Sequence, residues 1–188
     1  MLTYGDLLQS PDRFGELEGD DVLVTAVGDE TLVREGGRRR EATMIFQHET
    51  IAIMRAERAE ELGKLRAVIS EASAVVPLRK SPDSMWDHIT VGRASTSDIL
   101  IDDPAISNVH AHFEIDVDAD VTSVQDVGSS NGTHVNRRPL QPHAPAVLKS
   151  GDCVRFGQTI FYYINNRTLR DLVIPPSDDE AGGPFAGI

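Results

Sequence analysis

The chain has 188 residues and a formal net charge of −12 at pH 7, and 40% of its residues are hydrophobic. This length suits one well-cored domain with an additional segment, or two small domains. Residues 1–72 and residues 73–188 each carry 9 basic and 15 acidic side chains. Because neither half is basic, the composition argues against nucleic acid and anionic membranes as partners.

Nothing in the sequence indicates secretion or insertion into a membrane. No segment approaches the roughly 20 apolar residues that a membrane-spanning helix needs. Residues 1–21 lack the basic start, the long apolar core and the cleavage site of a signal peptide. The single cysteine, Cys153, excludes an intramolecular disulfide. Together these features predict a cytoplasmic protein.

The first part of the chain, residues 1–72, is predicted to be a small α+β region of unknown role. Residues 1–20 show little periodicity. Short apolar runs bounded by turn residues predict strands at 22–27, 31–35, 42–46 and 50–54. From residue 55 to residue 72 the pattern changes, because Leu62, Leu65 and Ile69 lie at helical spacing with charged residues between them. This segment is predicted to be one amphipathic helix.

The second part, residues 73–168, is predicted to consist of short strands without a helix of useful length. The connectors between them carry Pro, Gly, Asn and Asp. The predicted strands are 74–80, 88–93, 99–101, 110–117, 121–127, 133–136, 146–149, 153–157 and 159–165. Regular short strands with polar turns are typical of an antiparallel sandwich or barrel. Almost no linker separates the two parts, so we expect them to be tightly coupled.

The C-terminal residues 169–188 are predicted to be a disordered tail. The sequence PPSDDEAGGPFAGI is rich in proline, glycine and acidic residues, and it offers too little apolar surface to offset the entropy of ordering.

Four short motifs follow one another in the second part of the chain. They are VGR at 91–93, SNVHA at 107–111, DVGSSNGTHVN at 126–136 and LKSGDCVRFG at 148–157. Each motif alone is weak, but the ordered set resembles the forkhead-associated (FHA) domain, a module that binds phosphothreonine peptides. The resemblance covers about residues 73–168. It implies a mainly β fold, an antiparallel β-sandwich of the FHA type, preceded by the small α+β region.

The residue types in these motifs suit a phosphorylated ligand. A phosphothreonine carries a charge of about −1.5 to −2 and three strong acceptor oxygens. Arg93 supplies a planar fork of donors that matches phosphate. Ser107 and Ser130 supply hydroxyl groups, and Asn131 both donates and accepts hydrogen bonds, as pairing with an extended peptide requires.

The resemblance assigns a role to each of these residues. Arg93 and Ser107 are expected to hold the phosphate, with help from Ser130 and the backbone around Asn108. Asn131 is expected to hold the peptide main chain beside the phosphothreonine.

Three further residues are expected to support the site. The ring of His110 would tie the Ser107 loop to the neighbouring loop, Gly132 would permit the tight turn after Asn131, and Gly92 precedes Arg93 at the strand end. The resemblance implies no cofactor and no metal ion.

Other interpretations of the same residues predict different chemistry. Ser107 with His110 suggests a hydrolase, but no acidic partner or nucleophile elbow accompanies them. His110 with His112 suggests a metal site, but two ligands are too few. His112 is interpreted instead as a surface residue of a strand. Arg93 could form an ordinary ion pair with Asp98 or Asp102.

Two functions remain open from the sequence. The favoured one is a non-enzymatic interaction module in signalling that binds a phosphothreonine-containing protein through loops at one end of the sandwich. The alternative is a scaffold that uses the FHA fold for assembly without phosphate. Arg137 and Arg138, in the connector after the site strand, are either an exposed turn or additional positive charge beside the peptide. The partner, the kinase and the oligomeric state are not specified by the sequence.

Overall fold

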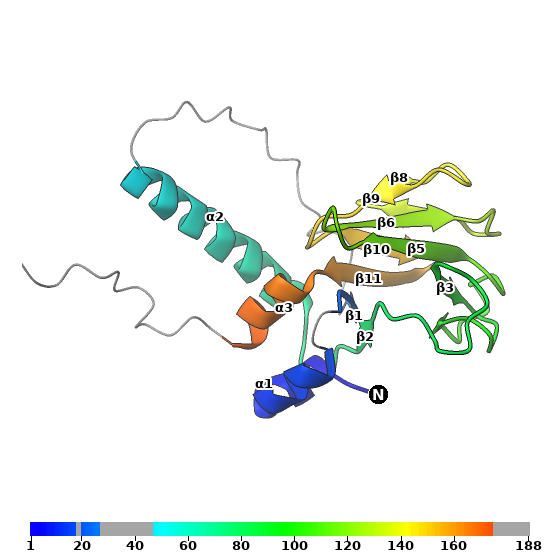
Figure 1. The fold of residues 1–188 in the computed structure, drawn as a ribbon, viewed down its shortest axis with the longest axis horizontal. Helices are drawn as coiled ribbons and strands as arrows, with labels where there is room; N and C mark the ends of the chain where they lie inside the picture. Colours follow the sequence, from blue (N-terminus) through cyan, green and yellow to red (C-terminus); the bar gives the residue numbers. More distant parts are fainter. Residues whose placement is uncertain (18–19, 27–46, 175–188) are drawn as a thin grey trace, which may run out of the picture.

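Two β-sheets packed face to face form the body of the molecule (Figure 1). The computed structural model describes residues 1–17, 20–26 and 47–174, with the backbone alone for 47–55. One sheet has six strands in the order β2-β1-β11-β10-β7-β8 and the other has five in the order β4-β3-β5-β6-β9. In the described chain the strand pairs are antiparallel except β3 with β4. The structure therefore confirms a mainly β sandwich.

The strands are short and are joined by polar turns. Those of the six-stranded sheet are β1 (Val22–Thr25), β2 (Val75–Pro77), β7 (Thr133–Val135), β8 (Arg138–Pro139), β10 (Cys153–Phe156) and β11 (Thr159–Ile164). Those of the five-stranded sheet are β3 (Ile89–Gly92), β4 (Ile99–Leu100), β5 (Ala111–Asp116), β6 (Val121–Asp126) and β9 (Ala146–Val147).

The core between the two sheets is formed by every second side chain of the strands. Ala111 and Phe113 of β5 and Val154 and Phe156 of β10 all point inward and are fully buried, because side chains two apart on a strand share one face. The rings of Phe113 and Phe156 pack edge to face, with their centroids 6.1 Å apart. This geometry is favourable for aromatic pairs.

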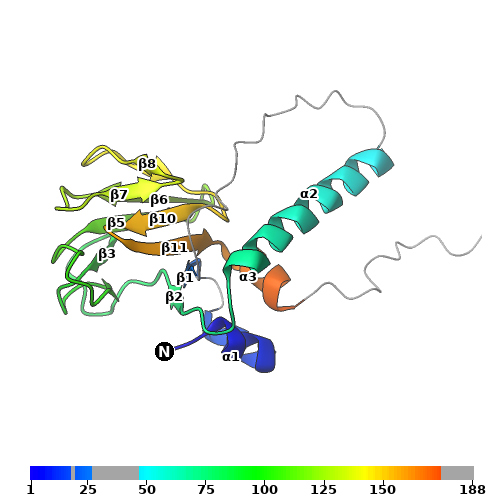
Figure 2. The same ribbon diagram turned by 180° about the vertical axis from the view of Figure 1, so that it is seen from behind.

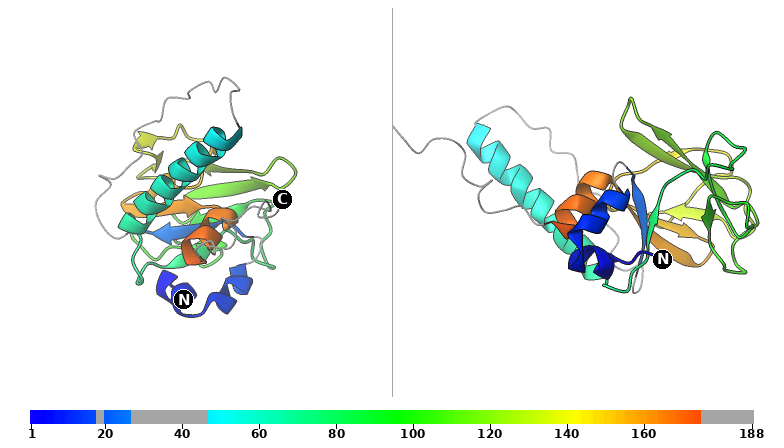
Figure 3. Two further views of the ribbon diagram at one scale, coloured as in Figure 1. Left: turned by 90° about the vertical axis from the view of Figure 1, so that its left-hand side faces the viewer. Right: turned by 60° about the horizontal axis from the view of Figure 1, so that its bottom comes forward.

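Helices cover the outer face of the six-stranded sheet at one end (Figures 2 and 3). They are α1 (Tyr4–Gln9), the 3-10 helix η1 (Pro11–Leu17), α2 (Gln47–Val68) and α3 (Asn166–Val173). A second apolar cluster joins them to the sheet, in which Leu7, Leu65 and Leu169 pack with Val24 and Ile164. No helix in the described ranges is long and apolar enough to cross a membrane.

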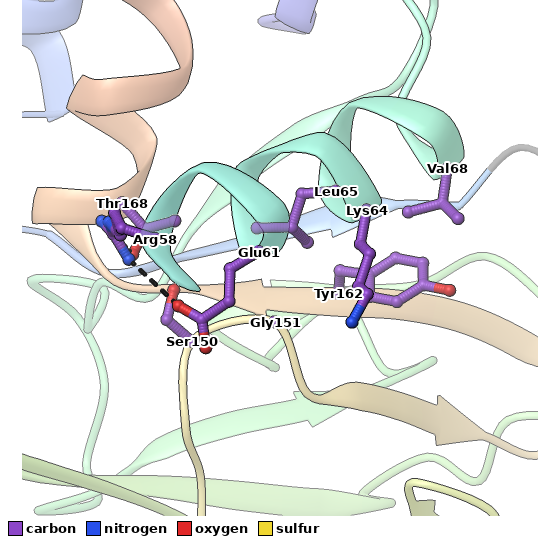
Figure 4. Close-up of a pocket in the computed structure, with 9 residues that line it drawn as sticks. All are labelled: Arg58, Glu61, Lys64, Leu65, Val68, Ser150, Gly151, Tyr162 and Thr168. Carbon is purple, nitrogen blue, oxygen red and sulfur yellow. Dashed lines mark hydrogen bonds and ion pairs between the residues drawn. The ribbon is translucent and has the colours of Figure 1, made fainter. Parts of the chain in front are cut away.

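The C-terminal half of α2 lies over β11 and the turn before β10. Beneath it is a pocket lined by Arg58, Glu61, Lys64, Leu65, Val68, Ser150, Gly151, Tyr162 and Thr168 (Figure 4). Arg58 closes one side of this pocket, because its guanidinium donates to Asp171 at 2.8 Å and to Thr168 at 3.0 Å. These contacts join α2 to α3.

The N-terminal segment contributes directly to the sandwich. Strand β1 lies between β2 and β11 and pairs with both. The carboxylate of Asp21 accepts hydrogen bonds from the Tyr163 hydroxyl, from Thr122 Oγ1 at 2.7 Å and from the Asn166 N–H at 3.2 Å. We therefore propose that the segment before residue 73 and the sandwich after it fold as one unit.

Replacing Tyr163 by Phe tests this proposal. Tyr163 is buried, and its pKa is raised because burial disfavours the phenolate and because it donates to Asp21. We expect Tyr163→Phe to lower the free energy of unfolding by about 1 kcal/mol, the usual net value of one hydrogen bond. Chemical denaturation should show one transition, shifted as a whole, with Thr122→Val giving a similar loss. Two transitions, of which only one moves, would contradict a single unit.

Two predictions about helices are wrong. Residues 50–54, predicted as a strand, lie within α2, which begins at Gln47 and ends at Val68 rather than at residue 72. Short apolar runs rich in β-branched residues fit a strand or a helix equally well. The predicted strands at 31–35 and 42–46 lie outside the described residues.

The predicted tail also begins too early. Residues 169–173 belong to α3, where Leu169, Leu172 and Val173 are buried. Asn165 caps this helix by accepting from the Thr168 N–H at 2.9 Å, as short polar side chains do at helix N-termini. Residues 175–188 lie outside the described residues.

Candidate functional site

Loops from three strand connections meet at the end of the sandwich opposite the helices. They are the β3–β4 loop (93–98), the β4–β5 loop (101–110) and the β6–β7 loop (127–132). The Arg93 N–H donates to the Ser107 carbonyl at 2.9 Å, and the Ser130 N–H donates to Ser107 Oγ at 3.0 Å. Asn131 Nδ2 donates to the Ala105 carbonyl at 2.7 Å. These bonds bring the predicted site residues together.

Arg93 lies directly after β3 and is exposed. Its Nε–H donates to the Ile106 carbonyl at 3.3 Å, and its two terminal nitrogens make no hydrogen bond to any described residue. Within the described chain Arg93 also forms no ion pair. The carboxylate of Asp98 is occupied instead by the N–H and hydroxyl of Thr90, both at 2.7 Å. The guanidinium therefore presents an anchored but uncompensated positive charge.

Hydroxyl and backbone donors lie on the loops joined to Arg93. The hydroxyl of Ser107 accepts from the Ser130 N–H and keeps its own proton available to donate. The carbonyl of Asn108 accepts from the Ala94 N–H at 3.1 Å and from Ser97 Oγ at 3.3 Å. In the described structure the Asn108 N–H has no acceptor. These groups are suited to bind oxygen atoms of an anion.

Asn131 is exposed on the β6–β7 loop. One hydrogen of its amide is used by the Ala105 carbonyl, which fixes the orientation of the side chain. The amide oxygen and the second hydrogen remain available, so Asn131 is able to accept and donate at once to an extended backbone.

His110 is fully buried and connects two of the loops. Its Nδ1 lies 3.2 Å from the Ser107 nitrogen and its Nε2 lies 3.2 Å from the Gly132 oxygen. A backbone N–H only donates and a carbonyl only accepts, so Nδ1 must be unprotonated and Nε2 must carry the proton. The ring also packs edge-on against the ring of Phe156, with the two centroids 5.7 Å apart. His110 is therefore held in its neutral form and acts as a strut, that is, a side chain that links the β4–β5 loop to the β6–β7 loop.

Lowering the pH is expected to break this strut. Burial lowers the pKa of His110 from 6.5, and this effect outweighs the Gly132 hydrogen bond and the charge of Asp126, which raise it. The neutral ring thus stabilises the fold fully above pH 6.5, and this stability is lost as the pH falls from 6.5 through the lowered pKa. Protonated Nδ1 cannot accept from the Ser107 N–H.

An NMR titration measures both events. The His110 ring should titrate below pH 6.5, and the Ser107 amide resonance should shift with the same midpoint. A ring that titrates at or above that value, with an unmoved Ser107 amide, would contradict the strut.

Two positions in the backbone of the site favour glycine, for different reasons. A Cβ on Gly92 would lie 2.1 Å from the Asn108 oxygen, so no other residue fits without moving the β4–β5 loop. Gly132 has φ +73°, a left-handed conformation that glycine adopts without strain. It permits the turn between Asn131 and β7.

The hydrolase and metal interpretations find no support in the described residues. The His110 ring accepts from the backbone N–H of Ser107 rather than from its hydroxyl, so it does not activate a nucleophile. No cluster of three or more His, Cys, Asp or Glu side chains in the described ranges is arranged to hold a metal ion. The prediction that His112 lies on the surface is wrong, because the residue is buried. The ring of His88 covers the ring of His112, with the two centroids 4.1 Å apart.

Arg137 and Arg138 belong to the hairpin that joins β7 to β8. Asn136 and Arg137 have φ values of 49° and 67°, as a two-residue hairpin turn requires. This turn lies at the end of β7 opposite Asn131, where Asn136 Nδ2 donates to Asp152 at 2.8 Å. The structure therefore places both arginines at a turn away from the three loops.

The sequence reading missed the groups that hold the site loops in place, the Ala105 carbonyl and the carboxylates of Asp98 and Asp126. Asp126 lies at the junction between β6 and a loop of small residues, where Asp commonly accepts from nearby N–H groups, here those of Gly128 and Ser129. That local pattern is the signal by which Asp126 could have been found. Asp98 accepts instead from residues more distant in sequence, such as Thr90 and Ser81.

Known proteins are similar to this chain in sequence. The family model described as "FHA domain" matches residues 89–157. The chain is 35% identical over 103 residues to an oxoglutarate dehydrogenase inhibitor of Corynebacterium jeikeium, covering 52% of this chain and 68% of that protein. It is 32% identical over 148 residues to the glycogen accumulation regulator GarA of Mycolicibacterium smegmatis, covering 70% of this chain and 85% of that protein.

Solved structures of FHA domains are also similar to the chain. The MEK1 FHA domain in complex with a phosphothreonine peptide of HOP1 shares 26% identity, with a TM-score of 0.41, over 50% of this chain and 89% of that one. The FhaA FHA domain, complexed with an intracellular domain of another protein, shares 26% identity with a TM-score of 0.40, over 48% and 87%. The sequence relatives and the family model show that this chain belongs to the FHA-domain family.

Proposed function

We propose that this protein binds phosphothreonine-containing proteins through the three loops described above. Arg93, Ser107 and the N–H of Asn108 would hold the phosphate, with Ser130 beside them, and Asn131 would hold the peptide backbone. The observation that supports this assignment best is the anchored Arg93 guanidinium, which lacks an anionic partner among the described residues. A charged donor kept in this way at a loop rim is suited to a ligand that brings the negative charge.

The expected energetics suit a reversible signal. Each hydrogen bond to a charged group contributes about 1.5–3 kcal/mol, and ordering a flexible peptide costs several kcal/mol in return. The balance corresponds to roughly micromolar affinity, about −8 kcal/mol. An unphosphorylated threonine loses most of the polar contribution, so binding would report the phosphorylation state of the partner.

We further propose that the protein acts by binding and not by catalysis, in the cytoplasm. The site holds neutral His110 as a strut and shows no activated nucleophile in the described chain. The relatives named above are called an inhibitor and a regulator. These names favour a role in which binding a partner changes the activity of that partner.

Capture of peptides from defined pools tests the proposal. Immobilised protein would be offered pools with randomised flanks around a fixed phosphothreonine, phosphoserine or threonine. We expect retention of the phosphothreonine pool above the other two. Equal retention of the phosphothreonine and threonine pools would favour the alternative, a scaffold that binds without phosphate.

A further inference from the structure

Asp126, the last residue of β6, is buried directly beneath the peptide-contact loop. The residue is 2% exposed. Its Oδ1 accepts from the N–H groups of Gly128 and Ser129, both at 2.8 Å. Its Oδ2 accepts from Ser129 Oγ at 2.7 Å and from Thr133 Oγ1 at 2.6 Å. One carboxylate therefore receives four hydrogen bonds.

These four donors flank the residues that face the ligand. Gly128 and Ser129 precede Ser130 and Asn131, and Thr133 follows them after Gly132. The carboxylate thus holds both ends of a three-residue segment, 130–132. Within this segment the Ser130 N–H donates to Ser107 Oγ and the Gly132 carbonyl meets His110. The position and orientation of Asn131 therefore depend on both ends of this segment being fixed.

The charge of Asp126 is maintained by the same contacts. Burial alone would raise its pKa, but the hydrogen bonds from Thr133, Ser129 and Gly128 outweigh burial and lower it. An ionised carboxylate accepts more strongly than a neutral group. The acid therefore holds the loop throughout the neutral pH range.

We propose that Asp126 is a positioning residue for phosphopeptide binding, which acts by clamping both ends of the segment that presents Ser130 and Asn131. This inference rests on the proposed function. It concerns a residue that does not touch the ligand, because the carboxylate is buried and its four acceptor positions are filled within the protein.

The clamp predicts graded effects of substitution. Asp126→Ala removes all four acceptor contacts, and we expect affinity for the phosphothreonine pool to fall about tenfold or more, since charged hydrogen bonds are lost. Asp126→Asn keeps one oxygen for the Gly128 and Ser129 N–H groups, while its amide donates to hydroxyls that are able to rotate. The asparagine variant should therefore recover much of the affinity. Thr133→Val releases only the far end of the segment and should fall between them.

A double-mutant cycle distinguishes positioning from a general structural role. Affinity for the fluorescent phosphothreonine pool would be measured by anisotropy for wild type, Asp126→Ala, Asn131→Ala and the double variant, with folding checked by circular dichroism. If Asp126 acts by placing Asn131, its substitution costs much less once Asn131 is absent. If Asp126→Ala does not fold, Thr133→Val and Ser129→Ala replace it in the same cycle.

The outcomes separate this inference from the function on which it rests. Non-additive losses, with recovery in Asp126→Asn, support the clamp. Additive losses, or wild-type affinity in a folded Asp126→Ala protein, overturn the clamp alone, provided that wild type binds the pool and Arg93→Ala does not. No binding of the pool by folded wild type overturns both.

Discussion

Replacing Arg93 by Ala should abolish measurable binding of phosphothreonine peptides while leaving the fold intact. The side chain is exposed and makes one hydrogen bond to the described residues, to the Ile106 carbonyl, so its removal costs little stability. Its two free terminal nitrogens would each lose a hydrogen bond to phosphate. At about 1.5–3 kcal/mol for each bond, the dissociation constant should rise by about 100-fold or more.

Two further variants define what Arg93 contributes. Arg93→Lys keeps the charge but loses the planar fork, so its affinity should lie between those of wild type and the alanine variant. Arg79→Ala is the matched control. Arg79 is an exposed arginine that lies in the connector after β2, and it forms an ion pair with Asp20. Fluorescence anisotropy with the phosphothreonine pool measures all four proteins. Wild-type affinity in Arg93→Ala would show that the phosphate binds elsewhere.

Replacing Gly92 by Ala should have the largest effect on stability. The added Cβ would lie 2.1 Å from the oxygen and 2.8 Å from the carbonyl carbon of Asn108. Both are backbone atoms, so either β3 or the β4–β5 loop must move. We expect a loss at or above the upper end of the ~1–3 kcal/mol typical of overpacking. Because the displaced loop carries Ser107 and Asn108, phosphopeptide affinity should fall as well.

Gly63→Ala supplies a control of opposite sign. Gly63 lies within α2, and a Cβ there would meet nothing within 4 Å. Alanine in an exposed helix interior is favoured over glycine by about 0.5–1 kcal/mol. Urea denaturation should therefore show Gly63→Ala slightly stabilised and Gly92→Ala strongly destabilised. If Gly92→Ala unfolded with the wild-type midpoint and bound normally, the close approach to Asn108 would not exist in solution.

The sandwich strands were largely predictable because strict alternation and turn residues act locally. In β5, buried Ala111 and Phe113 alternate with the more outward His112, and this period of two is visible in the sequence. The helices were less predictable. The apolar run at 50–54 fits either structure. In α3 the helical spacing of Leu169, Leu172 and Val173 covers little more than one turn before the proline-rich tail, which is too short a pattern to identify a helix.

The residues that make up the site were predictable from the sequence, but the contacts that hold them in place were not. The ordered motifs pointed to Arg93, Ser107, Ser130 and Asn131, and the structure brings their loops together. The contacts that hold the loops come from residues far apart in sequence, such as Asn131 with the Ala105 carbonyl. Such pairs depend on how the loops pack, and a single sequence contains no signal for them.

The most direct test of the account is an NMR titration of isotopically labelled protein with the tightest-binding phosphothreonine peptide recovered from the pool. We predict that the amide resonances of Ser107, Asn108, Ser130 and Asn131 move together and that those of α2 and α3 do not. The same peptide without phosphate should move none of them. Shifts confined to the helices, or equal shifts with both peptides, would contradict phosphothreonine recognition by these loops and favour a scaffold.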